Sequence, residues 1–192
     1  MENQGGRERS PGRIPEMSPV PRQLPLLSLP NLVLLPGNTV RLHCSRLPFE
    51  LSPSQQLCCV EQQHFLQFPL SRGCLAEVQQ LERVPTGVAF TLVGLRRLQI
   101  RGSIGVQVLV EADPFLPWPG GPLPEFSGLR PDVAALRQRI DGALWLDMVA
   151  FHLPLPLARR WALQQQPDPR ARAHQLAHAP RLAPVCLSLS AN

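Results

Sequence analysis

The stretch CLAEVQQLERVPTGVAFTLV, residues 74–93, decides the fold, because it has the pattern of two strands joined by a tight turn. The sequence PTG at residues 85–87 is a three-residue connection in which glycine supplies the positive φ that hairpin turns need. Val88, Phe90 and Leu92 recur with the period of two that indicates one buried strand face. The stretch therefore predicts a β-hairpin with an apolar inner face.

Further strands are predicted on both sides of this hairpin. Downstream, Leu98 and Ile100 alternate with polar residues after Gly94, and residues 102–105 form a turn into a strand over 106–112. Upstream, strand-like apolar runs lie at residues 24–27, 32–35, 40–44, 57–60 and 65–68. Residues 45–56 are rich in proline and serine and predict a loop. The strands thus occupy residues 24–112.

The pattern changes after residue 112. Prolines recur too often in residues 113–131 for regular structure, which predicts a crossing loop. Apolar residues then follow a helical spacing through residues 132–178. The expected helices run from 133 to about 152, from 157 to 166, and from a start signal at Asp168-Pro169 to about 178. Strands first and helices last predict an α+β domain.

The domain boundaries follow from the distribution of apolar residues. Residues 1–22 lack the apolar side chains that would offset the entropy of ordering, and they predict a flexible leader. One domain is expected over residues 23–180, with residues 181–192 as a tail. A chain of 192 residues suits one such domain with a real core.

The composition and motifs argue against an enzyme. All 19 basic residues are arginine, and the missing lysine excludes a Walker A loop, a Ser-Lys dyad and a Schiff base. The sequence GSIG at residues 102–105 is not the G-x-S-x-G nucleophile elbow, and neither HExxH nor GxGxxG occurs. No catalytic residue is predicted.

The cysteines indicate neither a disulfide framework nor a metal or cofactor site. They are odd in number and include no CxxC pair, at positions Cys44, Cys58, Cys59, Cys74 and Cys186. Several fit apolar strand positions, where a free thiol packs as a small hydrophobe. The N-terminus has no apolar signal core, and prolines interrupt the longest uncharged run, residues 23–40. These features predict a cytoplasmic protein that does not span a membrane.

The charge distribution argues against a nucleic-acid partner. The formal net charge is +5, and the surplus is spread along the chain. The only local concentrations are Arg96-Arg97 with Arg101, and residues 159–160, so a solvated surface is expected. Three carboxylates on the first predicted helix are likewise interpreted as solvated and not as an acid/base pair: Asp132, Asp141 and Asp147.

Several stretches resemble the N-terminal, substrate-binding domain of Lon proteases. LPLLSLPNLVLLPG at residues 24–37 is similar to the opening of that domain. GCLAEV at 73–78 with TLVGLRRLQI at 91–100 resembles its central hairpin and following strand. LDMVAFHLPL at 146–155 with Asp168-Pro169 resembles its C-terminal helices. The resemblance implies a PUA-like pseudo-barrel of mostly antiparallel strands, followed by a small helical bundle.

The sequence also departs from the family pattern. Family members usually open a helix after the third predicted strand, whereas this chain reads CSRLPFE at residues 44–50. A helix is therefore expected to be missing there. The chain also ends where Lon proteases continue into ATPase and protease modules, so we expect a freestanding domain without either module.

Two functions follow from these observations. The first is a non-catalytic module that binds protein or peptide segments, including unfolded apolar ones. The alternative is an RNA-binding module, because PUA-like architectures also bind RNA and arginine favours phosphate and base stacking. A titration with RNA at two salt concentrations distinguishes them, since phosphate-driven binding weakens with salt.

The candidate contact residues for a peptide lie in the crossing loop. They are Phe115, Leu116, Trp118, Leu123 and Phe126. Two interpretations of the aromatic rings remain open. They could seal the junction between strands and helices, as large aromatics usually do, or they could remain exposed as an apolar recognition patch. Trp145 and Trp161 lie on predicted helices and are interpreted as core residues.

Overall fold

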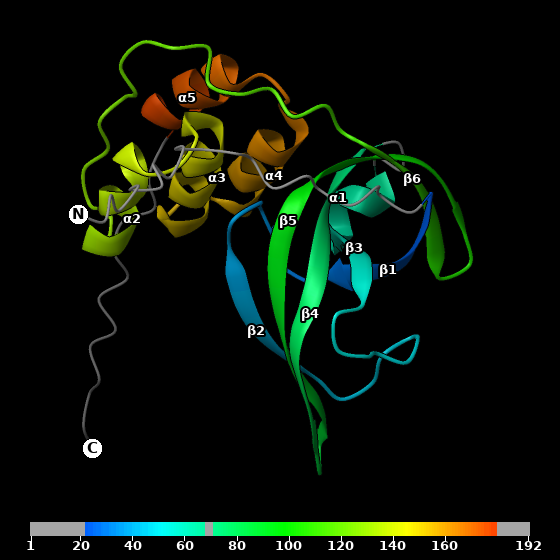
Figure 1. Ribbon diagram of the computed structural model, residues 1–192. Helices are drawn as coiled ribbons and strands as arrows, with labels where there is room; N and C mark the ends of the chain where they lie inside the picture. The colour runs from blue at the N-terminus through cyan, green and yellow to red at the C-terminus, as the bar shows by residue number, and fades with distance from the viewer. Residues whose placement is uncertain (1–21, 68–70, 180–192) are drawn as a thin grey trace, which may run out of the picture.

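The computed structural model describes residues 22–67 and 71–179, and Figure 1 shows the strands on one side of the molecule and the helices that follow them in the chain on the other. The predicted leader, apart from Arg22, and the predicted tail lie outside the described residues. The crossing loop runs from the strands over the helical layer (Figure 1). The described chain is an α+β fold, as predicted.

Six strands form a single mixed sheet that closes on itself. They are β1 (Gln23–Leu29), β2 (Thr39–Cys44), β3 (Gln56–Glu61), β4 (Arg72–Val84), β5 (Gly87–Ile104) and β6 (Gln107–Ala112). Their order is β2-β5-β4-β3-β1-β6, and β6 returns to pair with β5. Among the described residues, the β1–β3 pair is parallel and the other pairs are antiparallel. The predicted pseudo-barrel of mostly antiparallel strands is confirmed, with β2 outside the ring.

The β4–β5 hairpin is the predicted one, with a shorter connection. Val84 pairs with Gly87, so only residues 85–86 form the loop. Gly87 has φ +140°, and a Cβ there would lie 2.1 Å from the carbonyl oxygen of Cys44. Glycine is therefore required both by the backbone conformation and by the close approach of β2.

β5 is one continuous strand, and the predicted break after Gly94 is wrong. Its first half pairs with β2 and its second half with β6, while β4 follows both halves. Gly94 instead allows a close approach, because a Cβ there would lie 2.5 Å from the carbonyl oxygen of Leu35. The strand thus carries the chain from the exposed hairpin to the helical layer.

Two further predictions of strands are wrong. Residues 32–35 form no strand, because their backbone pairs with no neighbouring strand and the Leu34 carbonyl accepts instead from the Gln164 side chain at 3.0 Å. Val33 and Leu35 pack with the helices and Leu34 with the barrel. The apolar run at 65–68 is in part helix α1 (Gln62–Gln67), whose start is held by the Glu61 carboxylate accepting the His64 amide at 2.8 Å. Phe68 lies outside the described residues.

The region between β2 and β3 contains no helix. Residues 45–55 form bends and turns, in agreement with the loop predicted there. Leu51 from this loop is buried in the barrel, and Leu47 and Phe49 pack against the same cluster. The loop therefore covers the open end of the barrel with apolar side chains.

The helical layer contains a short entry and three longer helices. They are α2 (Pro131–Ala135), the 3-10 turn η1 (Leu136–Gln138), α3 (Gly142–His152), α4 (Leu157–Gln165) and α5 (Pro169–Ala177). The predicted single helix over 133–152 is broken, because the Asp141 carboxylate caps α3 by accepting the Ala143 amide at 2.7 Å. The start of α5 after Asp168 is confirmed, with Arg170 donating to its carboxylate.

The described cysteines are free and serve as packing residues. Cys58 and Cys59 are adjacent in β3 and fully buried in two different clusters of the barrel. Cys74 is buried opposite Cys59 on β4. Burial raises the pKa of the Cys58 thiol to about 12 and also raises the pKa of Cys74. Cys186 lies outside the described residues.

Candidate functional site

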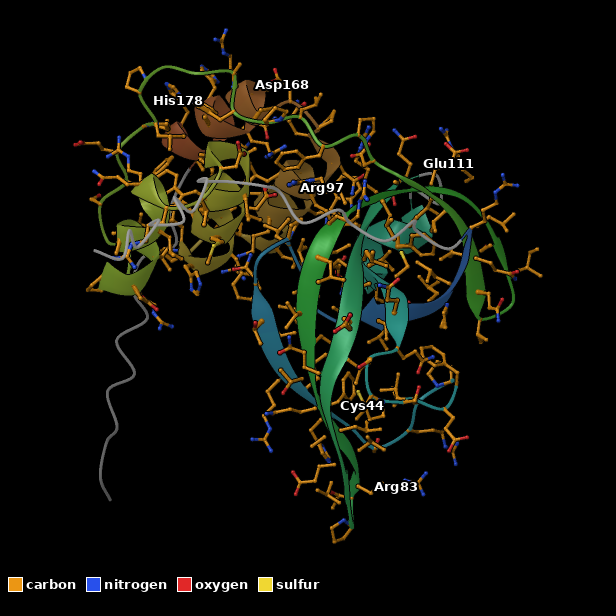
Figure 2. All side chains as sticks on the ribbon, in the orientation of Figure 1. Cys44, Arg83, Arg97, Glu111, Asp168 and His178 are labelled. Carbon is orange, nitrogen blue, oxygen red and sulfur yellow. The ribbon has the colours of Figure 1, made fainter. Side chains whose placement is uncertain are left out.

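A buried ion network joins the barrel to the helices. Asp147 on α3 is only 3% exposed, and Arg97 on β5 contacts both of its oxygens, with Nη2 at 2.7 Å from Oδ1 and Nη1 bonded to Oδ2. Nε of Arg172 on α5 lies 3.2 Å from the same Oδ1. Figure 2 shows Arg97 where β5 passes the helical layer. One carboxylate thus links three elements.

Both guanidinium groups also donate hydrogen bonds to backbone carbonyls of the helical layer. Arg97 donates to the carbonyls of Leu163 and Gln164, each at 3.2 Å. Arg172 donates to the carbonyls of Ala143, Gln166 and Pro167 at 2.7–3.3 Å. The interpretation of Asp147 and Arg97 as solvated charges is wrong, because folding brings them together across the junction.

The pKa values of the two arginines shift in opposite directions because Asp147 forms hydrogen bonds with Arg97 and acts on Arg172 only through its charge. Burial disfavours the charged form of Arg97, but the charge and hydrogen bonds of Asp147 outweigh it and raise the pKa of Arg97. Burial lowers the pKa of Arg172 to about 10, with Asp147 opposing that shift. Both side chains therefore carry their charge at neutral pH.

A second polar link fixes the start of the crossing loop. Asp113, 4% exposed, accepts hydrogen bonds from Nε of Arg72 at 2.7 Å and Nε2 of Gln99 at 3.1 Å. Arg72 is itself held by α4, since its amide donates to the Gln165 side chain at 2.6 Å and Nη1 donates to the Gln165 carbonyl at 2.9 Å. The loop thus leaves the barrel from a fixed point.

A shallow groove lies beside this link. It has a volume of about 220 Å³ and is lined by Ser71, Arg72, Gln99, Ile100, Arg101 and Gln165. Most of these side chains are polar, and two of them hold Asp113. A second hollow of about 180 Å³ lies on the hairpin side of the sheet, lined by Arg41, Glu82 and neighbouring residues. The groove at the junction is connected to the crossing loop through Arg72 and Gln99, which bind Asp113 two residues before Phe115.

The structure divides the five predicted contact residues into two groups. Phe115 and Leu116 are exposed, at 50% and 44%, and follow Asp113 closely. Trp118, Leu123 and Phe126 are half-buried and pack against the helical core. The first pair therefore projects to the solvent, while the other three seal the junction between loop and helices.

Trp118 anchors the crossing loop on the C-terminal side of the exposed residues Phe115 and Leu116. Its amide donates to Oδ2 of Asp141 at 3.2 Å, and its indole N–H donates to the carbonyl of Gly121 at 3.1 Å. Its Cβ lies so close to Gly142 that a Cβ on that glycine would be 2.9 Å away. Phe115 and Leu116 are thus held between two anchored residues, Asp113 and Trp118.

Replacing Trp118 with alanine should lower the free energy of unfolding by about 2 to 3 kcal/mol, less than a fully buried tryptophan because the ring is only half-buried. Urea denaturation measures this. Phe115→Ala is the control and should change the free energy of unfolding by no more than about 0.5 kcal/mol, since its side chain is exposed. An unchanged midpoint for Trp118→Ala would show that the ring does not seal the junction.

No metal centre emerges from the described residues, which contain no cluster of three or more histidine, cysteine or acidic side chains suited to hold an ion. Glu61 and His64 form a carboxylate–imidazole pair with Oε2 and Nδ1 2.6 Å apart. The His64 ring stacks on Trp161 of α4, with ring centroids 4.9 Å apart. This contact is a further link between the barrel and the helices.

The sequence did not single out Asp113 and Asp141 as loop anchors. Asp141 precedes Gly142-Ala143 in the pattern of a helix N-cap, and this local signal could have revealed the break in the predicted helix. Asp113 carries no comparable signal, because its partners Arg72 and Gln99 are distant in sequence.

The closed ring of strands with a helical layer at one end defines the chain as a pseudo-barrel α+β domain. No protein-family model matches the sequence, and no curated protein matches it. None of the helices in residues 22–67 and 71–179 is long and apolar enough to span a membrane.

Solved structures define the class more narrowly. The N-terminal domain of a Mycobacterium avium complex Lon protease matches 80% of this chain and 95% of its own, with a TM-score of 0.54 and 18% identity. A Lon N-terminal domain protein from Xanthomonas campestris matches 82% of this chain and 99% of its own, with a TM-score of 0.53 and 26% identity. The chain has the fold of a Lon N-terminal domain.

Proposed function

We propose that this chain is a non-catalytic module that binds protein or peptide segments, including unfolded apolar ones, through Phe115 and Leu116. The observation that carries the proposal is the exposure of these two large apolar side chains on a loop anchored at both ends. The fold of Lon N-terminal domains, which belong to proteases, supports a protein ligand. The described residues form a module with the fold of a Lon N-terminal domain, and they include no recognisable catalytic domain.

The anchored loop favours binding for an entropic reason. Residues that dock on a partner lose rotational and backbone freedom, and preorganised anchors lose less. Phe115 and Leu116 lie between Pro114 and Pro117, whose rings restrict the backbone further. The adjacent polar groove provides hydrogen-bonding side chains for the main chain of an extended ligand. The surface therefore suits an extended peptide that places an apolar side chain on Phe115 and Leu116 and its main chain along the polar groove.

The distribution of charges supports a protein ligand over RNA. The described arginines within ion-pair distance of a carboxylate are Arg41, Arg72, Arg83, Arg97, Arg101, Arg130, Arg137 and Arg172. Pairing with acidic side chains offsets the positive potential that phosphate binding requires. We also propose a cytoplasmic location, to which the free thiols of the barrel are suited.

The double substitution Phe115→Ser and Leu116→Ser should weaken binding of an unfolded protein at least about tenfold, because both apolar anchors are lost. The ligand is a fluorescently labelled, reduced and carboxymethylated protein, and anisotropy measures its binding. Ile104→Ser is the matched control, since Ile104 is 64% exposed at the β5–β6 turn and lies outside the loop. The melting temperature of all variants should stay unchanged.

Two results would contradict the proposal. One is equal loss of binding in the Ile104→Ser control, which would indicate non-specific adhesion to exposed apolar side chains. The other is tight binding of single-stranded or structured RNA that weakens steeply with salt, without binding of the unfolded protein. The second result would support the RNA-binding alternative.

A further inference from the structure

Two histidines lie one turn apart on the last described helix. The sequence HQLAH at residues 174–178 places His174 on α5 and His178 at its C-cap. Both side chains are exposed, and their rings stack with centroids 4.3 Å apart and planes 28° apart. Figure 2 shows His178 at the edge of the helical layer. Residues four apart on a helix share one face, so both rings are available to one ligand.

The hydrogen bonding of His178 determines which ring nitrogen is free. Its Nδ1 lies 2.9 Å from the backbone carbonyl of His174. A carbonyl oxygen only accepts hydrogen bonds, so Nδ1 carries the proton and Nε2 keeps its lone pair. A metal-binding histidine usually has this arrangement, with one nitrogen donating to a carbonyl and the other free to coordinate.

The end of the helix adds a favourable electrostatic field. The last carbonyls of an α-helix carry a partial negative charge, which favours a cation within the last turn. Both histidines belong to this last turn of α5. Arg170, one turn earlier on the same stripe, opposes this attraction, because its guanidinium repels a cation.

We propose that His174 and His178 form a surface binding site for a divalent transition-metal ion. Two neutral imidazoles at i and i+4 bind such an ion from one helix face, and water molecules complete its coordination. Imidazole ligands select zinc, copper or nickel and not magnesium or calcium, which prefer oxygen ligands. The proposal is independent of the proposed peptide binding.

Titration of the full chain with nickel chloride, followed by calorimetry, tests the site. The wild type should bind Ni²⁺, and His174→Ala or His178→Ala should each weaken binding at least about tenfold, because the second imidazole binds intramolecularly. Both variants should keep their melting temperature, since the two side chains are exposed. His43→Ala, an exposed histidine on β2, is the matched control and should bind as the wild type does.

Two further measurements test whether the two histidines, and not other side chains, bind the Ni²⁺ ion. Ni²⁺ binding should weaken as the pH falls, because protons compete for the imidazoles. Arg170→Ala should bind Ni²⁺ more tightly than the wild type. The proposal is overturned if His174→Ala and the wild type bind equally, if no binding occurs at millimolar Ni²⁺, or if thiolate-to-metal absorption bands assign the ion to cysteine.

Discussion

Replacing Asp147 with alanine should lower the free energy of unfolding by about 3 to 5 kcal/mol, because two buried guanidinium groups would lose the carboxylate that they share at the junction. Arg97 and Arg172 would retain their carbonyl contacts, but these cannot neutralise two positive charges that lie side by side. Urea denaturation followed by tryptophan fluorescence measures the change.

Asp132→Ala is the matched control for this substitution. Asp132 pairs with Arg130 at the exposed start of α2, where solvent screens the ion pair, so its loss should change the free energy of unfolding little. Adding Arg97→Met to Asp147→Ala should recover part of the lost stability, because one unpaired buried charge is removed. Equal effects of the Asp132 and Asp147 substitutions would show that the buried network does not join the barrel to the helices.

Trp145→Ala should also lower the free energy of unfolding by about 3 to 5 kcal/mol, because it opens a cavity in the centre of the helical core. The Trp145 ring is fully buried, and its indole N–H donates to the carbonyl of Val133 at 3.0 Å. Phe126 of the crossing loop packs on the same ring, with centroids 5.7 Å apart. Calorimetric unfolding at several urea concentrations measures the loss.

Trp145→Phe separates packing from hydrogen bonding. It keeps an aromatic ring against Phe126 but removes the indole donor, so the loss should be clearly smaller than for alanine. If the alanine variant melts like the wild type, the core around α3 does not depend on this ring. Loosening of the crossing loop in the alanine variant should also weaken peptide binding, since the loop then no longer holds Phe115 in place.

The parts of the fold that were predicted correctly depend on neighbouring residues. The hairpin at residues 74–93 combines a period of two with a glycine-containing turn, and both signals lie within one short stretch. The start of α5 needs only the Asp168 side chain and the amide of Arg170. Such local interactions form between residues close in sequence, so a single sequence records them directly.

The incorrect strand at residues 32–35 shows where local patterns fail. Its alternating apolar side chains resemble a strand, but its backbone pairs with no neighbouring strand, and the Leu34 carbonyl accepts from the Gln164 side chain of α4. A paired strand and an unpaired extended segment show the same period of two in the sequence. The position of the helices above the barrel determines that residues 32–35 are an unpaired segment.

The candidate site was predicted as a loop, while its division into anchors and exposed residues was not. Phe115, Trp118 and Phe126 are all aromatic residues in one proline-rich segment, and composition does not distinguish them. Trp118 and Phe126 are half-buried because Gly142 and Trp145 on α3 lie beneath them. Phe115 is exposed because the loop there has just left its anchor at Asp113.

The α+β class, the central hairpin, the irregular crossing loop and the absence of lysine chemistry could be predicted, since these depend on composition and local spacing. The burial of Asp147 between Arg97 and Arg172, 50 and 25 residues away in the chain, could be found only from the folded structure. A charge looks the same in a sequence whether it is solvated or paired. The free energy of burying it depends on partners that only the folded chain brings within hydrogen-bonding distance.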